Sequence, residues 1–297
     1  MEKINTEVFL KIAECGNFSG AAKALDYTQA GISYIVNTME SELGFRLFIR
    51  EYGGVRLSAE GEILLPYFRQ LANDERLFYS KVNELRDMHC GSIKVLVFNS
   101  VSVHRIPYIL KEYRRDYPGI EVELISVENS AQAEEVISRQ DADLGFLLHE
   151  PRRSDIDTVP LMKERMMAIT APDHPLACRE KFPVSELGNY PYIRMAFGDE
   201  TGVSDIFYSR NIDPKVLYNM DNDYAAMAMV SAGHGFCIFP ELSLRGVPYD
   251  LRIMEFDEPV SRTVSIAAKS MKTCSAAARL FVDYTRRWVA DFLREQG

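Results

Sequence analysis

The segment from residue 19 to residue 43, SGAAKALDYTQAGISYIVNTMESEL, constrains the fold most, because it predicts two short helices joined by a tight turn. Ser19 can cap a first helix whose alanines allow close packing. The corner from Asp26 to Thr28 breaks that helix, and Thr28 can cap a second one. Apolar side chains recur in the second helix at a spacing that buries one face: Ile32, Ile35, Val36, Met39 and Leu43. The pattern predicts a helix-turn-helix.

The opposite face of the second helix carries uncharged side chains that form hydrogen bonds. They are Gln29, Ser33, Tyr34 and Asn37. Side chains of this kind contact base edges when a recognition helix lies in the major groove of double-stranded DNA. Thr28, besides capping, is a candidate for a phosphate contact. The alternative interpretation is an ordinary solvated helix face.

A short basic segment follows the two helices and predicts a β-wing. Strands are expected around Phe48 and from Val55 to Leu57, with Gly53 and Gly54 at the turn between them. Arg50 and Arg56 flank this turn. Because arginine binds phosphate through two parallel hydrogen bonds, both are expected to contact the DNA backbone.

Net charge gives the predicted DNA-binding domain no general attraction to DNA. Residues 1–60 contain six basic and eight acidic side chains, a balance of −2. Binding must therefore depend on where the arginines are placed. We expect modest affinity for each domain and a need for dimerisation.

A long helix is predicted after Ser58, over residues 59–89. Positions at alternating steps of four and three are mostly apolar, namely Leu64, Phe68, Leu71, Glu75, Phe78, Val82 and Leu85. So narrow a stripe favours a coiled-coil-like dimer seam, and the alternative is packing against the rest of the same chain. Pro66 removes a backbone hydrogen bond, so a kink or an irregular first turn is expected.

The run from Phe9 to Gly61 resembles the DNA-binding domain of LysR-type transcriptional regulators. The matching residues are Phe9, Phe18, Ser19, Ala21, Ala22, Leu25, Gln29, Ser33, Ile35, Glu40, Leu43, Gly44, Leu47, Phe48, Arg50, Leu57, Ser58 and Gly61. The resemblance continues more weakly through residues 91–98, 143–145 and 230–240. Tyr34 stands where many members carry a basic or amide residue, and Ala30 where many carry proline. The base preference therefore cannot be copied from the family.

Strand-like and helical runs alternate after residue 90, which predicts a parallel α/β architecture. Strands are expected at 93–98, 122–127, 144–148, 216–219, 236–239 and 263–268, and helices at 106–117, 132–139, 205–210, 224–232 and 276–294. The family resemblance implies two lobes like those of periplasmic solute-binding proteins, with the chain crossing near Leu161 and returning near Ala267. The predicted division is a winged helix-turn-helix domain (1–58), a linker helix (59–89) and an effector domain (90–297). Lobe one would hold residues 90–161 and 267–297, and lobe two residues 162–266.

The cleft between the lobes is the predicted site for a small-molecule inducer. Ser100 and Ser102 follow the first buried strand and could hold a carboxylate or another anion. Asn129 and Ser130 would add a polar wall. By the family resemblance, Thr201 faces them across the cleft. The alternative for each serine is a simple helix cap.

Motifs of catalysis, metal binding and export are missing from the sequence. It contains no nucleophile elbow, Walker loop or dinucleotide-binding glycine motif. The five cysteines show no ligand or disulfide spacing. No signal segment opens the chain, and no stretch approaches the roughly 18 apolar residues of a membrane span. We therefore expect a cytoplasmic non-enzyme with no cofactor, no metal, no catalytic residue and no membrane partner.

The combined prediction is an effector-modulated transcriptional regulator. It would bind an interrupted palindromic operator as a homodimer or homotetramer, with RNA polymerase as a further partner. Two alternatives remain open: a cysteine-based redox regulator of the same family, and a small-molecule solute-binding protein. The sequence does not indicate the effector, the target genes, or activation against repression.

Overall fold

A computed structural model describes residues 4–85, 90–195 and 203–296. The chain divides into two compact units, residues 1–87 with 139–141, and residues 88–138 with 142–297.

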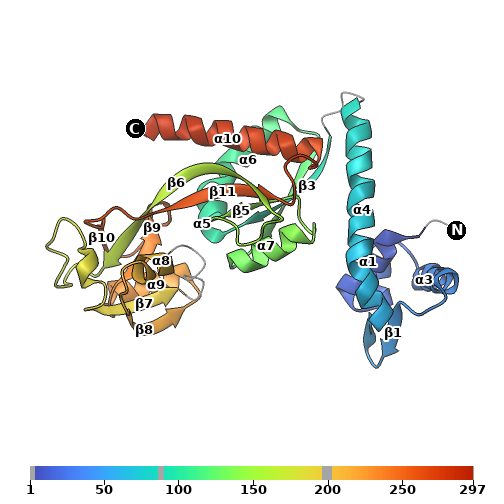
Figure 1. The fold of residues 1–297 in the computed structure, drawn as a ribbon, viewed down its shortest axis with the longest axis horizontal. Helices are drawn as coiled ribbons and strands as arrows, with labels where there is room; N and C mark the ends of the chain where they lie inside the picture. Colours follow the sequence, from blue (N-terminus) through green and yellow to red (C-terminus); the bar gives the residue numbers. More distant parts are fainter. Residues whose placement is uncertain (1–3, 86–89, 196–202, 297) are drawn as a thin grey trace. The chain divides into compact units, whose positions relative to one another are not determined.

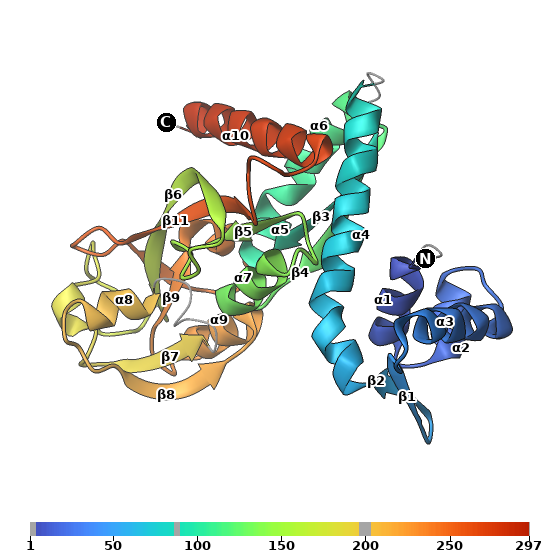
Figure 2. The same ribbon diagram turned by 45° about the vertical axis from the view of Figure 1, so that its right-hand side comes forward.

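The N-terminal unit is a winged helix-turn-helix followed by a long helix (Figures 1 and 2). Its elements are α1 (Thr6–Cys15), α2 (Phe18–Ala24), α3 (Gln29–Leu43), β1 (Phe48–Glu51), β2 (Gly54–Leu57) and α4 (Ala59–Leu85). The wing strands pair antiparallel, with Phe48 opposite Leu57 and Glu51 opposite Gly54. The helix-turn-helix, the wing and the long helix were each predicted from the sequence.

Side-chain caps fix where the first three helices begin. Thr28 caps α3 as predicted, because its hydroxyl accepts a hydrogen bond from the Gly31 backbone N–H at 3.1 Å. The prediction that Ser19 caps α2 is wrong. Asn17 does so, accepting from the Gly20 N–H at 2.6 Å. The helix therefore starts at Phe18, whose ring is buried in the core of this unit.

A buried carboxylate connects α3 to the wing. Glu40 is 7% exposed and accepts hydrogen bonds from the backbone N–H groups of Leu47, at 2.7 Å, and Phe48, at 3.1 Å. Arg46 donates to the same carboxylate at 2.9 Å. Because buried N–H groups are costly to leave unpaired, this carboxylate holds the start of β1 against the end of α3.

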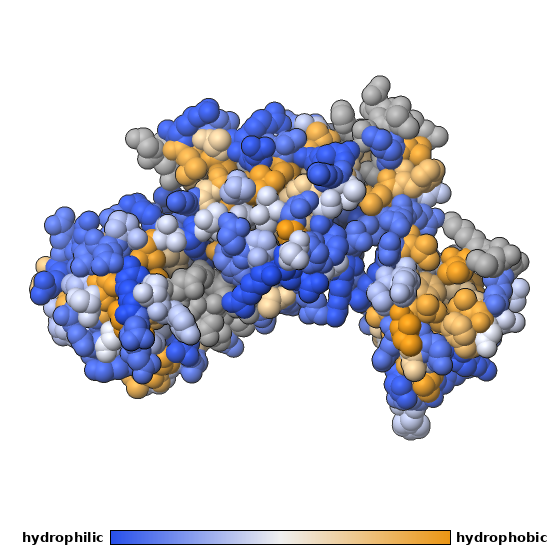
Figure 3. Space-filling view, viewed as in Figure 1, coloured by the Kyte–Doolittle hydropathy of each residue, from blue (hydrophilic) through white to orange (hydrophobic). Residues whose placement is uncertain are grey.

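The helix α4 is continuous through Pro66. The dimer-seam prediction is wrong at its first two positions, because Leu64 and Phe68 pack into the core of the N-terminal unit. Phe68 is 4% exposed and stacks on Phe9 with ring centroids 3.8 Å apart. Beyond this point, Leu71 and Phe78 are 49% and 63% exposed. Figure 3 shows hydrophobic surface over this part of α4.

The second unit is built on a seven-stranded sheet. Its strands are β3 (Gly91–Val97), β4 (Ile120–Ser126), β5 (Leu144–Leu147), β6 (Asp157–Thr170), β9 (Cys237–Pro240), β10 (Arg252–Met254) and β11 (Ser261–Ala268). The order is β10-β6-β11-β5-β3-β4, and β9 also pairs with β6. A separate parallel pair consists of β7 (Pro191–Met195) and β8 (Lys215–Met220).

Helices cover these strands on both sides. They are α5 (Asn99–His104), α6 (Ile106–Asp116), α7 (Ser130–Ser138), α8 (Val203–Tyr208), α9 (Asp223–Ser231) and α10 (Ala276–Gln296), with short 3-10 turns η1 (Val184–Glu186) and η3 (Glu241–Leu244). In Figures 1 and 2, α10 runs along one face of the large sheet and α7 lies against the other.

The sheet differs from the predicted parallel architecture because it is mixed. β3 pairs parallel with β4 and β5, whereas β11 pairs antiparallel with β5 and β6. The sequence pattern also missed β6, β7 and β10. The burial along β6 changes from alternating to continuous near Met166, so no single periodicity describes the strand.

Two lobes have separate cores, joined by β6 and β11. The first core includes Ile93, Phe146 and Phe281, and the second lobe is packed around Phe182 and Phe236 and around Ile193 and Met227. Val264 and Ile266 belong to the first core. The chain therefore returns to the first lobe earlier than the predicted crossing near Ala267.

Candidate DNA interface and small-molecule cavity

The helix α3 has one buried face and one polar face. Ile32, Val36 and Met39 are buried in the core of the N-terminal unit. On the other side Gln29, Tyr34 and Asn37 are exposed, and Ser33 is half-buried. Tyr34, the single aromatic residue of this helix, is 73% exposed. The four predicted base-contacting side chains thus share one accessible face.

The wing presents its two arginines differently. Arg56 donates through Nε to Glu51 on the opposite strand. The Arg50 guanidinium lies over the Phe18 ring at 5.2 Å, and no carboxylate of the described residues pairs with it. A groove of about 570 Å³ next to it is lined by Asn37, Arg46 and Arg50 among others. Arg50 is therefore the more available cation.

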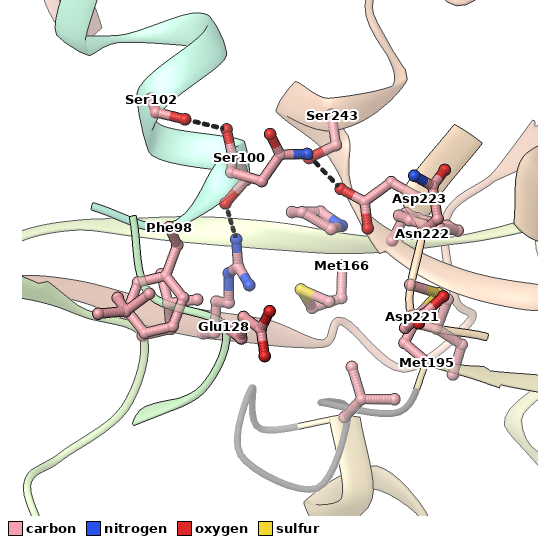
Figure 4. A pocket seen from close by; sticks show the side chains of 18 of the residues that line it. Phe98, Ser100, Ser102, Glu128, Met166, Met195, Asp221, Asn222, Asp223 and Ser243 are labelled. Atoms are coloured by element: carbon pink, nitrogen blue, oxygen red, sulfur yellow. Dashed lines mark hydrogen bonds between the residues drawn. The ribbon is translucent and has the colours of Figure 1, made fainter. Parts of the chain in front are cut away.

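The second unit contains a cavity of about 460 Å³ between its two lobes (Figure 4). Residues after β3 and β4 line one side, and residues from β6, β7, β9, η3 and the start of α9 line the other. The polar and charged lining residues are Asn99, Ser100, Ser102, Ser126, Glu128, Tyr192, Asp221, Asn222, Asp223, Ser243 and Arg262. The volume is that of a small-molecule site.

Ser100 and Ser102 lie where the sequence predicted them, and both line the cavity. The Arg262 guanidinium donates to the Ser100 hydroxyl at 3.2 Å, while the Ser102 hydroxyl donates to the Asn99 carbonyl at 3.0 Å. The Asn99 amide donates across the cavity to Asp223 at 3.0 Å. This bond joins α5 of the first lobe to α9 of the second.

Two other predicted effector contacts, Asn129 and Ser130, are not part of this wall. Among the described residues, Asn129 and Ser130 do not line the cavity; the Asn129 side chain accepts a hydrogen bond from the Gln132 N–H at 2.8 Å at the start of α7. The local reason is that β4 ends one residue earlier than predicted, so Glu128 occupies the expected place. Thr201 lies outside the described residues.

Sequence reasoning missed the most strongly charged part of the site. Arg262 and Glu164 are 5% and 6% exposed, and Arg262 donates to Glu164 through Nη2 at 2.7 Å and Nε at 2.8 Å. Burial lowers the pKa of the neighbouring Arg105, although Glu164 opposes that shift. Nothing in the sequence pairs Arg262 with a residue 98 positions away. The Asn222 cap before α9, in contrast, is a local signal that could have located Asp223.

Other kinds of site have little support in the described part of the chain. No group of three or more potential metal ligands occurs among those residues. The five cysteines are free, and burial raises the pKa of the Cys237 thiol and that of the Cys274 thiol. Within the described ranges, no helix has both the length and the apolar character needed to cross a bilayer.

Comparison with known proteins matches both units. Residues 5–62 match the lysR family of bacterial regulatory helix-turn-helix proteins, and residues 86–290 match the LysR substrate binding domain. The chain belongs to the LysR family of transcriptional regulators. It is thus a DNA-binding transcriptional regulator with an effector-binding domain, as the sequence predicted.

The similarity extends over almost the whole LysR-type chain. The transcriptional regulator YvbU of Bacillus subtilis (strain 168) is 28% identical over 284 residues, covering 94% of this chain and 96% of the relative. Full-length OxyR C199D from Pseudomonas aeruginosa has the same fold with a TM-score of 0.70 and 17% identity, covering 95% and 96% of the two chains. Full-length CbnR complexed with its target DNA has a TM-score of 0.68 at 22% identity, and the match covers 97% of this chain and 99% of CbnR.

Proposed function

We propose that this LysR-type regulator reads an interrupted palindromic operator as a homodimer or homotetramer. The recognition helix α3 would contact base edges through Gln29, Ser33, Tyr34 and Asn37. Thr28, Arg50 and Arg56 would contact the phosphate backbone. The observation that carries the proposal is the division of α3 into a buried apolar face and an accessible polar face beside a wing. The fold shared with CbnR, a regulator solved on its target DNA, supports it.

A small-molecule effector would bind in the cavity of the second unit. Its lining comes from both lobes, so a ligand that contacts both would favour one relative arrangement of the lobes over another. The proposed functional division keeps residues 1–58 for DNA reading, 59–89 for dimerisation and 90–297 for effector binding. RNA polymerase is the further partner that such a regulator would influence.

Selection of DNA from a random library tests the operator proposal. The full-length protein is expected to enrich an interrupted palindrome, and Tyr34→Ala is expected to change the enriched bases while the spacing of the half-sites stays the same. The matched control is Tyr108→Ala, an exposed tyrosine on α6 of the second unit. Enrichment without any repeated half-site, or a base preference identical in Tyr34→Ala, would contradict this role of α3.

The two wing arginines are expected to differ in their effect on DNA binding. Arg50→Ala should weaken binding to all sequences and reduce the slope of log affinity against log salt by about 1, because one phosphate contact is lost. Arg56→Ala should change the slope less, since Glu51 already neutralises this guanidinium. Fluorescence anisotropy from low to high salt measures both slopes. If Arg50→Ala and the unsubstituted protein have the same salt slope, Arg50 does not contact the DNA backbone.

Two of the five cysteines, Cys237 and Cys274, do not favour the redox alternative. Cys237 is fully buried in β9, and burial raises its thiol pKa, so the reactive thiolate is scarce. Burial also raises the pKa of the Cys274 thiol. The solute-binding alternative does not account for the helix-turn-helix. Effector sensing through the cavity is therefore the proposed mechanism.

A further inference from the structure

The cavity between the lobes is lined by more negative than positive charge. Three carboxylates line it, those of Glu128, Asp221 and Asp223. Arg262 is the one basic residue among its described lining residues, and the buried carboxylate of Glu164 neutralises it. Arg105 interacts electrostatically with Glu164 but does not line the cavity. Even with Arg105 counted, acidic groups are in excess around the ligand space.

The carboxylates come from both lobes and are available to a ligand. Glu128 follows β4 in the first lobe, whereas Asp221 and Asp223 follow β8 in the second. Figure 4 shows Glu128 on one side of the cavity and Asp221 and Asp223 on the other. The Asn99 amide donates to Asp223, but no described side chain donates to Glu128 or Asp221. A ligand that donates hydrogen bonds could therefore reach two lobes at once.

A buried hydroxyl in the same cavity independently indicates a ligand. Ser243 is 8% exposed, lines the cavity from η3, and its Oγ has no hydrogen-bond partner among the described residues. In Figure 4 its side chain extends into the space between Ser100 and Asp223. Buried polar atoms are nearly always paired, so this oxygen is expected to accept a hydrogen bond from a bound molecule.

We propose that the cavity takes a positively charged amine with an apolar body, and not the carboxylate or other anion that the serines suggested. This inference rests on the proposed effector function. The ammonium group would donate to the carboxylates and to Ser243, and such charge-assisted hydrogen bonds are stronger than neutral ones. The apolar body would contact Phe98, Met166 and Ile238, which line the same space. An anion in this place would be repelled by three carboxylates.

The inference is tested with matched pairs of ligands, in which an ammonium group on one apolar body is replaced by a carboxylate group. Phenethylamine is compared with 3-phenylpropanoate, and cyclohexylmethylamine with cyclohexylacetate, by titration calorimetry of the full-length protein at low salt. At least one amine should bind, and about tenfold or more tighter than its carboxylate partner. The double variant Glu128→Gln/Asp221→Asn should weaken the binding of that amine by a similar factor. The control Glu121→Gln/Asp213→Asn removes the same amount of charge at positions that do not line the cavity, and it should leave amine binding unchanged.

The outcomes separate this inference from the proposed function. A carboxylate that binds better than its amine partner, or amine binding that survives Glu128→Gln/Asp221→Asn, overturns the inference. If neither amine binds, the inference is overturned as well. Operator affinity is measured alongside by fluorescence anisotropy. If a carboxylate changes operator affinity, the proposed control of DNA binding by an effector stands, and the inference of an amine ligand is refuted. An amine that binds without changing operator affinity would support the amine site and contradict the proposed function.

Discussion

Glu164→Ala is expected to lower the free energy of unfolding of the two-lobed unit by about 3 to 5 kcal/mol. The substitution leaves the Arg262 guanidinium buried without its carboxylate, and a buried unpaired charge is among the most costly defects in a protein. Urea denaturation followed by Trp288 fluorescence measures the effect. Trp288 is the single tryptophan of the chain and packs against the core of the first lobe, so its signal reports this unit.

A double variant separates loss of the pair from loss of either side chain. Glu164→Met/Arg262→Leu replaces both charges with apolar groups of similar size and should recover most of the lost stability. Glu241→Ala removes a carboxylate from an exposed pair with Arg165 and should cost less than about 1 kcal/mol. If the double variant is no more stable than Glu164→Ala, the cost does not come from the unpaired Arg262.

Leu71→Asp/Phe78→Asp is expected to convert the assembled protein into monomers. Both side chains are exposed on α4 beyond the part that packs into the N-terminal unit, and each Asp would place like charges across a dimer seam. Sedimentation velocity measures the size. Binding to a two-half-site operator should fall by about 100-fold or more, because the second half-site contact is no longer intramolecular.

The matched control places two charges on exposed apolar positions of the second lobe. Tyr208 and Leu217 are 89% and 53% exposed there, and Tyr208→Asp/Leu217→Asp should leave sedimentation unchanged. Circular dichroism should show full helix content in both variants. An unchanged sedimentation profile for the α4 variant would assign Leu71 and Phe78 to a role other than dimerisation.

The DNA-binding unit could be predicted well because its determinants are local. The helical spacing of Ile32, Val36 and Met39, the Thr28 cap and the glycine turn of the wing each act within a few residues. The error at Ser19 is also local, since Asn17 is an equally good cap two residues earlier. The proposed base contacts remain predictions, because they depend on a partner molecule.

The effector cavity was predicted only in part because its chemistry is non-local. Ser100 follows a strand with a clear buried pattern, so its place at the edge of the sheet could be inferred. The partner of Arg262 is Glu164, on an adjacent strand of opposite direction. That pairing depends on an antiparallel register that no sequence periodicity encodes. The acidic character of the cavity likewise appears only when residues of two lobes are brought together.

The connection between the lobes limits how a ligand can move them. β6 and β11 pass from one lobe to the other as an antiparallel pair, with partners from Ser261 and Arg165 to Ala268 and Asp157 and an irregularity between Val264 and Ser265. Such a ribbon resists stretching and sharp bending, because either would break ladder hydrogen bonds, but its twist can vary. A bulge increases local twist further. We therefore expect ligand binding to turn the lobes by torsion of this ribbon, over a small angle set by its stiffness, without a hinge that swings freely.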